Sequence, residues 1–161
     1  MGRRVVEGCT DADGFLLGRK TYDIFSSYWP NVTDPANAIA TALNGLPKYV
    51  VSRSLRQVAW HNARLIEGDV VTGLRALRAV PGRTIQTWGS TELLQTLLKH
   101  DLIDEYRLFV YPLALGSGKR LFGQGTVPVA FEPVESATTP KGATFLRLRP
   151  RGKPTYGTMG A

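Results

Sequence analysis

Residues 89–122 read GSTELLQTLLKHDLIDEYRLFVYPLALGSGKRLF, and this stretch predicts a helix, a strand and a glycine loop in succession. Leucines between positions 93 and 98 recur at helical spacing and predict a short amphipathic helix after Gly89. Ser90 is a suitable N-cap, because its hydroxyl can accept from a free backbone N–H of the next turn. Beyond Glu105 the side chains alternate between two faces, which predicts a strand that Pro112 ends.

The N-terminus of this helix is a candidate anion site, because residues 85–88 have the composition of a strand and lead directly into Gly89. The backbone N–H groups of Gly89, Ser90 and Thr91 would face a phosphate there, and the helix dipole would add to the attraction. In the alternative interpretation, Gly89 only makes a tight turn and Ser90 only caps the helix. The spacing alone favours this alternative.

The loop at residues 115–119 does not have the pattern of a nucleotide-binding P-loop. Arg120 follows Lys119 where that motif needs Ser or Thr for the metal, and Leu113 occupies the position of the upstream glycine.

A second strand end has the same character. Residues 15–17 form a short apolar run that fits a buried strand, which Gly18 ends before a helix closed by Pro30. Arg19, Lys20 and Thr21 then lie at a helix N-terminus, where backbone N–H groups and two cations can hold the phosphates of a dinucleotide. The alternative is an ordinary solvated first turn.

A third strand end is polar. Residues 49–51 predict a strand that runs into Ser52, Arg53 and Ser54. A hydroxyl and a guanidinium at the carboxyl end of a strand suit a ribose 2′-phosphate, although a plain polar terminus explains them too. Ligands of parallel sheets bind beyond the carboxyl ends of the strands, so the convergence of Gly18, Ser52 and Gly89 favours a dinucleotide site.

The remaining segments predict helices and strands by the same rules. Val5, Val6 and Cys9 favour a helix over residues 4–11, and Asp34 with Pro35 is expected to begin another that Gly45 stops. Asp69 is expected to cap a helix in which Leu74 and Leu77 face the core. Two late strands, at residues 129–137 and 143–148, are joined by turn residues 139–142 and predict a hairpin.

Taken in order, the motifs at residues 18–22, 48–53, 88–91, 101–105, 111–112, 115–119 and 121–122 resemble a known family. They are similar to the C-terminal reductase domain of the bifunctional riboflavin-biosynthesis deaminase-reductase, and to related stand-alone proteins of dihydrofolate-reductase fold. The resemblance extends from about residue 14 to about residue 148. It implies an α/β three-layer sandwich with a mostly parallel mixed central sheet and a C-terminal antiparallel hairpin, which agrees with the strand–helix alternation.

The resemblance also implies an activity and a site. It implies an NADPH-dependent reductase of a ribosylaminopyrimidine, of the 5-amino-6-(5-phosphoribosylamino)uracil type, or of a pterin-like ring. NADPH would be bound by three motifs, whose residues are Gly18, Arg19, Lys20, Thr21, Ser52, Arg53, Gly89, Ser90 and Thr91. The nicotinamide and the substrate would lie toward a fourth segment, made of Leu113, Gly116, Ser117 and Gly118. No residue is assigned as the catalytic proton donor, and a homodimer is suggested by the resemblance alone.

The chain departs from the family pattern at its start. Family members have a strand, a loop with an acidic residue and a helix before the Gly-Arg-x-Thr motif, whereas residues 1–14 precede Phe15 here. The nearby carboxylates, Asp11 and Asp13, have the character of helix-end and turn residues. We therefore expect the chain to be a fragment or its start to be assigned too late, and to be a poor catalyst as given. An alternative function is an NADP(H)-binding protein of the same fold with little or no activity.

Composition bounds these expectations. The 161 residues suit one domain, expected over residues 1–150, with a flexible tail over residues 151–161. No apolar run approaches the roughly 20 residues of a membrane span, and the N-terminus lacks the apolar core of a signal peptide. The single cysteine, Cys9, fits a reducing compartment and is expected to be a small buried group. We therefore expect a cytoplasmic protein.

The charge pattern favours a small-molecule partner. The net charge of +7 is compatible with nucleic-acid binding, but Arg and Lys are dispersed over every segment. We therefore expect no nucleic-acid partner, while a basic RNA- or DNA-binding domain stays as a third hypothesis. His61 and His100 have no companions at metal-ligand spacing, so no metal site is expected.

Overall fold

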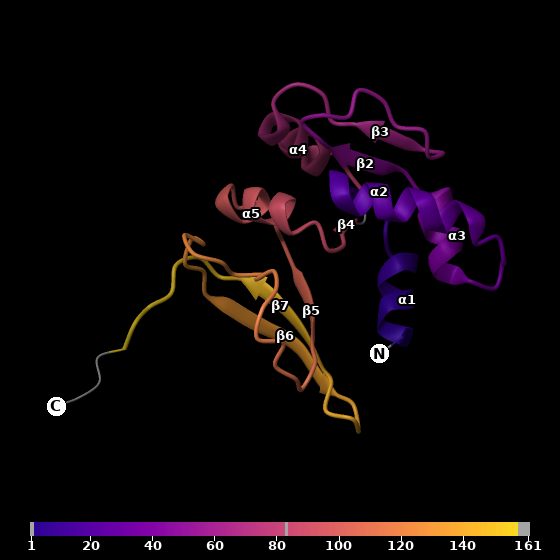
Figure 1. Cartoon of the computed structure of the whole chain (residues 1–161). Coiled ribbons are helices and arrows are strands. Elements are labelled where there is room, and N and C mark those ends of the chain that lie inside the picture. The colour runs from indigo at the N-terminus through magenta and orange to yellow at the C-terminus, as the bar shows by residue number, and fades with distance from the viewer. Residues whose placement is uncertain (1, 83, 158–161) are drawn as a thin grey trace. The chain divides into compact units, whose positions relative to one another are not determined.

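The computed structural model describes residues 2–82 and 84–157 (Figure 1). The chain divides into an N-terminal unit, Gly2–Thr96, and a C-terminal unit that begins at Leu97. Each unit has its own sheet and is described separately.

The N-terminal unit contains a parallel sheet. Its strands are β1 (Gly14–Gly18), β2 (Lys48–Val51), β3 (Ala63–Leu65) and β4 (Ile85–Thr87), in the order β3-β2-β1-β4. Strand β1 pairs with β2 from Phe15↔Lys48 onward and with β4 from Gly14↔Ile85 onward. Because β1 has a neighbour on each side and helices on its faces, it is buried over residues 14–17, as its continuous apolar sequence predicts.

Helices separate most of the strands of this unit, although β3 follows β2 directly. They are α1 (Gly2–Thr10), α2 (Arg19–Tyr28), the 3-10 turn η1 (Trp29–Asn31), α3 (Ala38–Gly45) and α4 (Val70–Ala79). A further helix, α5 (Thr91–Lys99), begins in this unit and continues past its boundary. Asp69 caps α4 as predicted, since its carboxylate accepts from the N–H of Thr72 at 2.7 Å. No helix among the described residues is long and apolar enough to cross a membrane.

The start of α3 differs from the sequence prediction. Asp34 accepts from the N–H of Ala36 at 2.9 Å and forms a local turn instead of capping a helix. The cap is Asn37, whose side-chain oxygen accepts from the N–H of Ala40 at 3.0 Å. Asn37 is as good a cap as Asp34, and it stands directly before the apolar residues that face the core, so the helix begins there.

The core of the N-terminal unit is built around β1. Phe15, Leu17, Leu43 and Val50 are fully buried, and Trp88 meets the ring of Phe15 edge to face at 6.0 Å. Cys9 is also fully buried, and burial raises the pKa of its thiol to about 11, which agrees with a packing role.

Lys48 is the buried charged residue of this core. Its ammonium donates to the carbonyls of Leu43 and Asn44, at 2.8 and 3.1 Å, and lies 4.5 Å from the centre of the Trp60 ring. It therefore satisfies carbonyls at the C-terminus of α3, where the helix dipole favours a cation. Burial nevertheless lowers the pKa of Lys48 to about 8.

The C-terminal unit contains an antiparallel sheet. Its strands are β5 (Tyr106–Val110), β6 (Phe131–Thr138) and β7 (Thr144–Pro150), in the order β5-β7-β6. Thr139 closes the turn between β6 and β7, because its N–H donates to the carbonyl of Ala143 and its own carbonyl accepts from the N–H of Gly142. The predicted hairpin is therefore confirmed. The parallel sheet with its covering helices and the antiparallel strands together confirm the predicted mixed α/β class.

The first two residues of the predicted tail, Arg151 and Gly152, are hydrogen-bonded to Ala130. Arg151 donates to the carbonyl of Ala130, and Ala130 donates to Gly152, both at 2.8 Å. Residues 151 and 152 therefore continue the pairing of the hairpin past Pro150, because the ladder still has a partner strand there. The tail residues 158–161 lie outside the described residues.

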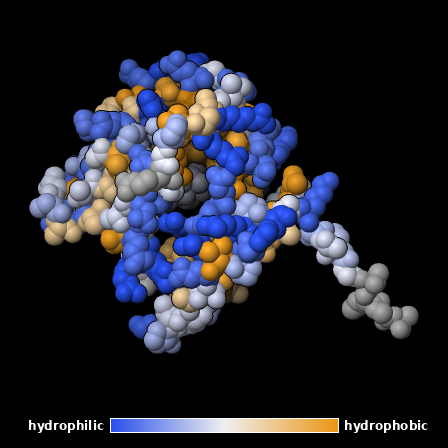
Figure 2. Space-filling model, turned by 180° about the vertical axis from the view of Figure 1, so that it is seen from behind, coloured by the Kyte–Doolittle hydropathy of each residue, from blue (hydrophilic) through white to orange (hydrophobic). Residues whose placement is uncertain are grey.

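The exposed surface mixes charge with scattered apolar side chains. On the face shown in Figure 2, hydrophilic residues cover most of the area, with smaller hydrophobic areas between them. The exposed apolar residues include Ile24 and Tyr28 of α2. Scattered apolar side chains of this kind are normal on a protein surface.

Candidate functional site

Three of the predicted site residues join the carboxyl ends of β1 and β4. The N–H of Gly18 donates to the hydroxyl of Ser90 at 3.0 Å, and the N–H of Ser90 donates to Oγ1 of Thr21 at 3.1 Å. The Ser90 hydroxyl also lies 3.1 Å from Thr21 Oγ1 and 3.1 Å from the carbonyl of Trp88. We call this group of contacts the Gly18–Thr21–Ser90 junction. It fixes the start of α2 against the turn that precedes α5.

The backbone at this junction is left-handed over two residues, with φ of +58° at Gly89 and +48° at Ser90. Glycine adopts this conformation without cost, whereas serine there is unusual and is held by the three hydrogen-bonding partners of the junction. A Cβ on Gly89 would meet Thr21 Oγ1 at 3.6 Å, which is an ordinary contact. The glycine is therefore required by its backbone angle more than by crowding.

The role predicted for Ser90 is corrected by this geometry. Its hydroxyl accepts from Gly18 in the neighbouring strand, and not from the next turn of its own helix. Its N–H is also bonded to Thr21, so it is not one of the free donors that the sequence predicted. The N–H groups of Gly89 and Thr91 stay as the candidate donors on this side of the site.

The N-terminus of α2 is the better candidate for an anion site. Gly18 is its N-cap, with extended backbone angles and no side-chain hydrogen bond to the first turn. Arg19, Lys20 and Thr21 begin a helix of 10 residues, so their N–H groups and the helix dipole face the end of β1. A Cβ on Gly18 would lie 3.5 Å from side-chain atoms of Ser90 and Leu93, so the glycine is in close contact with the start of α5.

Arg19 links this helix to the loop after β2. Its guanidinium donates to the hydroxyl of Ser54 at 2.7 Å and lies 3.5 Å from the carboxylate of Asp23. Arg19 was predicted beside the dinucleotide phosphates because of its position in the chain. The structure directs its guanidinium toward the loop that holds Ser52 and Arg53, where a ribose phosphate was expected.

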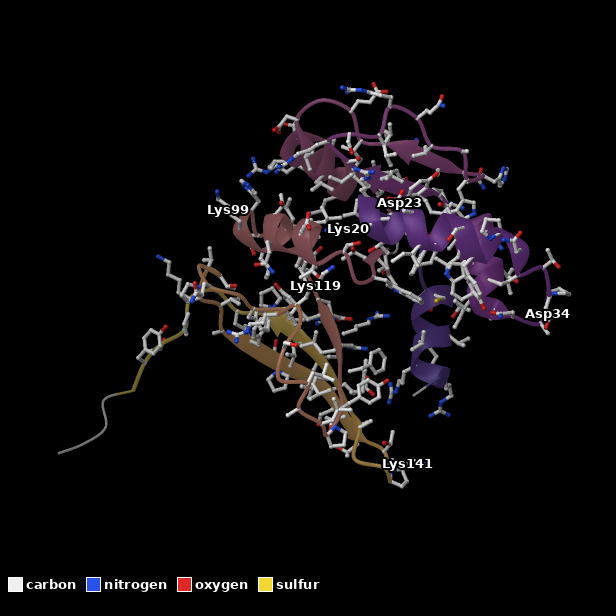
Figure 3. All side chains as sticks on the ribbon, in the orientation of Figure 1. Lys20, Asp23, Asp34, Lys99, Lys119 and Lys141 are labelled. Atoms are coloured by element: carbon white, nitrogen blue, oxygen red, sulfur yellow. The ribbon has the colours of Figure 1, made fainter. Side chains whose placement is uncertain are left out.

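Lys20 has a partner on α5. Its ammonium, on the side chain labelled in Figure 3, lies 3.1 Å from a carboxylate oxygen of Glu92. Both side chains are largely exposed. An exposed pair of this kind contributes little to stability, and an incoming phosphate can replace the carboxylate. Glu92 itself disfavours an anion at the first turn of α5, which again favours the N-terminus of α2.

Ser52 shapes its own loop. Its hydroxyl accepts from the N–H groups of Ser54 and Leu55, at 3.2 and 3.0 Å. Arg53 between them is exposed and makes no hydrogen bond or ion pair with any described residue. The loop therefore presents a guanidinium, that of Arg53, which pairs with no described residue, and the Ser52 hydroxyl also lies 3.5 Å from the hydroxyl of Ser54.

The residues predicted for the nicotinamide and substrate side lie in the C-terminal unit. Leu113, Gly116, Ser117 and Gly118 belong to an exposed loop after β5. Gly116 and Gly118 have positive φ values of 72° and 145°, which explains the choice of glycine at both positions. The N–H of Ser117 donates to the carbonyl of Leu115 at 2.8 Å and closes a tight turn.

The carboxylates near the N-terminus have structural roles. Asp13 accepts from the N–H of Thr84 at 3.1 Å and thereby ties the turn before β1 to the start of β4. Asp11 is exposed and follows the end of α1. Both positions agree with the turn and helix-end roles predicted from the sequence.

Sequence reasoning missed two residues of the site. Ser54 receives the hydrogen bond from Arg19, and Glu92 pairs with Lys20. Ser54 was visible as the third residue of a polar strand end, and Glu92 as an acidic residue in the first turn of a helix. Neither signal indicates which distant residue will be the partner.

Comparison with known proteins identifies the family. The profile of the RibD C-terminal domain matches residues 2–145. The chain belongs to the RibD C-terminal domain family. The resemblance drawn from the sequence motifs is therefore confirmed.

A curated protein is similar to this chain in sequence. The protein YyaP of Bacillus subtilis strain 168 is 32% identical over 112 residues, which cover 68% of this chain and 59% of the relative. This RibD C-terminal domain therefore spans about 59% of the length of that curated relative.

Solved structures share the fold. A putative riboflavin biosynthesis protein from Shewanella sp. PV-4 aligns with a TM-score of 0.72 at 24% identity, over 94% of this chain and 80% of that one. The diaminohydroxyphosphoribosylaminopyrimidine deaminase/5-amino-6-(5-phosphoribosylamino)uracil reductase of Thermotoga maritima aligns with a TM-score of 0.62 at 18% identity, over 92% of this chain and 48% of that one. The chain thus has a riboflavin-pathway reductase-like fold.

Proposed function

We propose that this RibD C-terminal domain binds NADPH at the carboxyl ends of β1, β2 and β4. The observation that carries the proposal is the hydrogen bond from Arg19 to Ser54, which joins the uncapped start of α2 to the polar loop after β2. The N-terminus of α2 would hold the pyrophosphate, and Arg19, Ser52 and Arg53 would hold the ribose 2′-phosphate. A phosphate dianion suits this place, since two guanidinium groups provide forked donors.

The residues of the chain fit this group. The helix start carries no competing side-chain cap, and Arg53 makes no hydrogen bond or ion pair with any described residue. Bound NADPH would supply a hydride, and the protein would supply orientation and positive charge. The Gly18–Thr21–Ser90 junction would keep the two strand ends in fixed register while the dinucleotide lies across them.

We further propose that the reaction is reduction of a ribosylaminopyrimidine or a pterin-like ring. Support comes from the family match and from the relative in Thermotoga maritima, whose name includes a 5-amino-6-(5-phosphoribosylamino)uracil reductase activity beside a deaminase activity. The other candidate is NADP(H) binding without efficient catalysis. It is favoured by the structural use of Asp13, whose carboxylate is bonded to Thr84.

Binding is tested by titrating NADPH and NADH and following fluorescence quenching, for the wild type and for Arg53→Ala. Loss of one exposed phosphate contact is expected to weaken NADPH binding about fivefold, which corresponds to about 1 kcal/mol, and to leave NADH binding nearly unchanged. Arg75→Ala is the matched control, because Arg75 is an exposed arginine on α4. Equal affinity of the wild type for NADH and NADPH would refute the 2′-phosphate site.

Turnover is tested separately. NADPH oxidation is followed at fixed enzyme with 5-amino-6-(5-phosphoribosylamino)uracil and with a dihydropterin as the two substrates. Oxidation that depends on one substrate supports the reductase, whereas tight NADPH binding without oxidation supports the binding protein. No binding of either dinucleotide rejects both.

A further inference from the structure

The antiparallel sheet of the C-terminal unit carries three arginines around one carboxylate. Arg107 of β5 lies directly opposite Arg147 of β7 in the strand register. Arg149 lies two residues further along β7 and therefore on the same face of the sheet. Like charges placed opposite one another destabilise a strand pair, so this arrangement requires an explanation.

Glu105 holds the three guanidinium groups together. One of its oxygens lies 3.0 Å from Nε of Arg107, and the other lies 3.5 Å from Nε of Arg147 and 3.5 Å from Nε of Arg149. One carboxylate compensates only one of these three positive charges. Glu135 adds a weaker contact, 3.9 Å from Nη1 of Arg147.

The other charges on this face do not remove the excess. Glu132 is register partner to Arg149 and interacts with its charge, but its carboxylate is hydrogen-bonded to Arg151, whose Nε lies 3.0 Å away. The ion pairs of this face therefore involve four arginines and three glutamates, which are Glu105, Glu132 and Glu135, and one positive charge is left in excess. The positive charge in excess lies at the Arg107–Arg147–Arg149 cluster.

The cluster has unused donors that solvent reaches. In the ion pairs of this cluster, each arginine contacts a carboxylate through Nε, and Arg147 also does so through Nη1. The other Nη atoms of the three arginines have no partner among the described residues. The Nε atom of Arg147 is buried and lacks a hydrogen bond of acceptable geometry within the described residues. The three side chains are 33–56% exposed, so an anion from solution can approach them.

We propose that the Arg107–Arg147–Arg149 cluster binds the phosphate group of a small phosphomonoester. A tetrahedral oxyanion offers several acceptors to several guanidinium forks at once, and its charge offsets the excess that Glu105 leaves. The three side chains project from paired strands, which hold their spacing better than a loop does. The proposal is independent of the NADPH site, which lies in the N-terminal unit.

The test is an NMR titration of the full chain with inorganic phosphate and with glycerol 3-phosphate, at constant ionic strength set with chloride. The Nε–H signals of arginine are followed. The signals of Arg107, Arg147 and Arg149 are expected to shift together and to saturate in the millimolar range or below. Arg147→Gln is expected to weaken binding about tenfold or more.

Two further variants separate an anion site from a purely structural ion-pair network. Arg147→Lys keeps the charge but loses the fork, and it is expected to bind phosphate more weakly than the wild type. Glu105→Gln removes the competing carboxylate and is expected to tighten binding about threefold, even if it lowers stability. An unchanged or weakened affinity in Glu105→Gln would overturn the proposal, as would absent saturation in the wild type. Binding of a single-stranded oligonucleotide with no response to either small phosphate would overturn it too.

Discussion

The Gly18–Thr21–Ser90 junction makes a quantitative prediction about stability. Ser90→Ala leaves the partly buried N–H of Gly18 without the acceptor that lies 3.0 Å from it. An unpaired donor of this kind costs about 1–3 kcal/mol, so the free energy of unfolding of the N-terminal unit is expected to fall by about 2 kcal/mol. Thr21→Val removes the acceptor of the Ser90 N–H, at 3.1 Å, and is expected to cost about 1 kcal/mol.

The double variant tests whether the two residues act together. The Ser90 and Thr21 hydroxyl oxygens lie 3.1 Å apart, so each single substitution already breaks the contact between them. The double variant should therefore be less destabilised than the sum of the singles, by about 0.5–1.5 kcal/mol.

Urea unfolding followed by tryptophan fluorescence measures these changes. Trp29, Trp60 and Trp88, the three tryptophans of the chain, all lie in the N-terminal unit and report on it specifically. Ser27→Ala is the control, because its exposed hydroxyl only bonds the carbonyl of Ile24 within α2, and it is expected to change stability by less than about 0.5 kcal/mol. Strict additivity, or a Ser90→Ala effect no larger than that of the control, would refute the reasoning.

Three other predictions follow from the structure. Lys48 has a folded pKa of about 8, below its ordinary value of 10.5, so unfolding takes up a proton between these two pH values. As the pH rises from 8 to 10.5, the free energy of unfolding of the wild type should therefore increase relative to that of Lys48→Met, by on the order of 3 kcal/mol. Denaturant unfolding of both proteins at several pH values tests this, and parallel curves of stability against pH would contradict it. Cys9, whose pKa is raised to about 11, has the opposite effect on stability, but it is present in both proteins and cancels in the comparison. Gly89→Val forces a β-branched residue to a φ of +58°, so NADPH binding should weaken. An NADPH titration measures the affinity, and the circular dichroism spectrum should stay native. An unchanged affinity would exclude this turn from the site. Truncation after Gly152 should leave the melting temperature nearly unchanged. Truncation after Pro150 should lower it, because the hydrogen bonds of Arg151 and Gly152 with Ala130 are lost. Equal melting temperatures of the two truncated proteins would show that this pairing does not stabilise the fold.

Local signals in the sequence were sufficient for the elements and their order. The apolar run of β1, the leucine spacing of α5 and the alternation of β5 each depend on neighbours within a few residues, and the structure has all three. The family assignment also followed from the sequence, because its motifs are short and occur in a fixed order. Asp69 was recognised as a cap for the same reason, since its partner is three residues away.

The partners of the site residues depend on contacts that local patterns do not encode. Ser90 bonds Gly18 across a separation of 72 residues, and Arg19 bonds Ser54 across 35. Both pairs exist because β1 lies between β2 and β4 in the sheet, and strand order follows from the packing of the whole unit rather than from the period of any one segment. Ser90 is the clearest case: its type and position predicted a helix cap, whereas its positive φ and the nearby end of β1 direct its hydroxyl to another strand. The sequence thus specified which residues line the strand ends. The tertiary fold specified which of them are bonded to one another, and which, such as Arg53, bond to none of the residues that the structure describes.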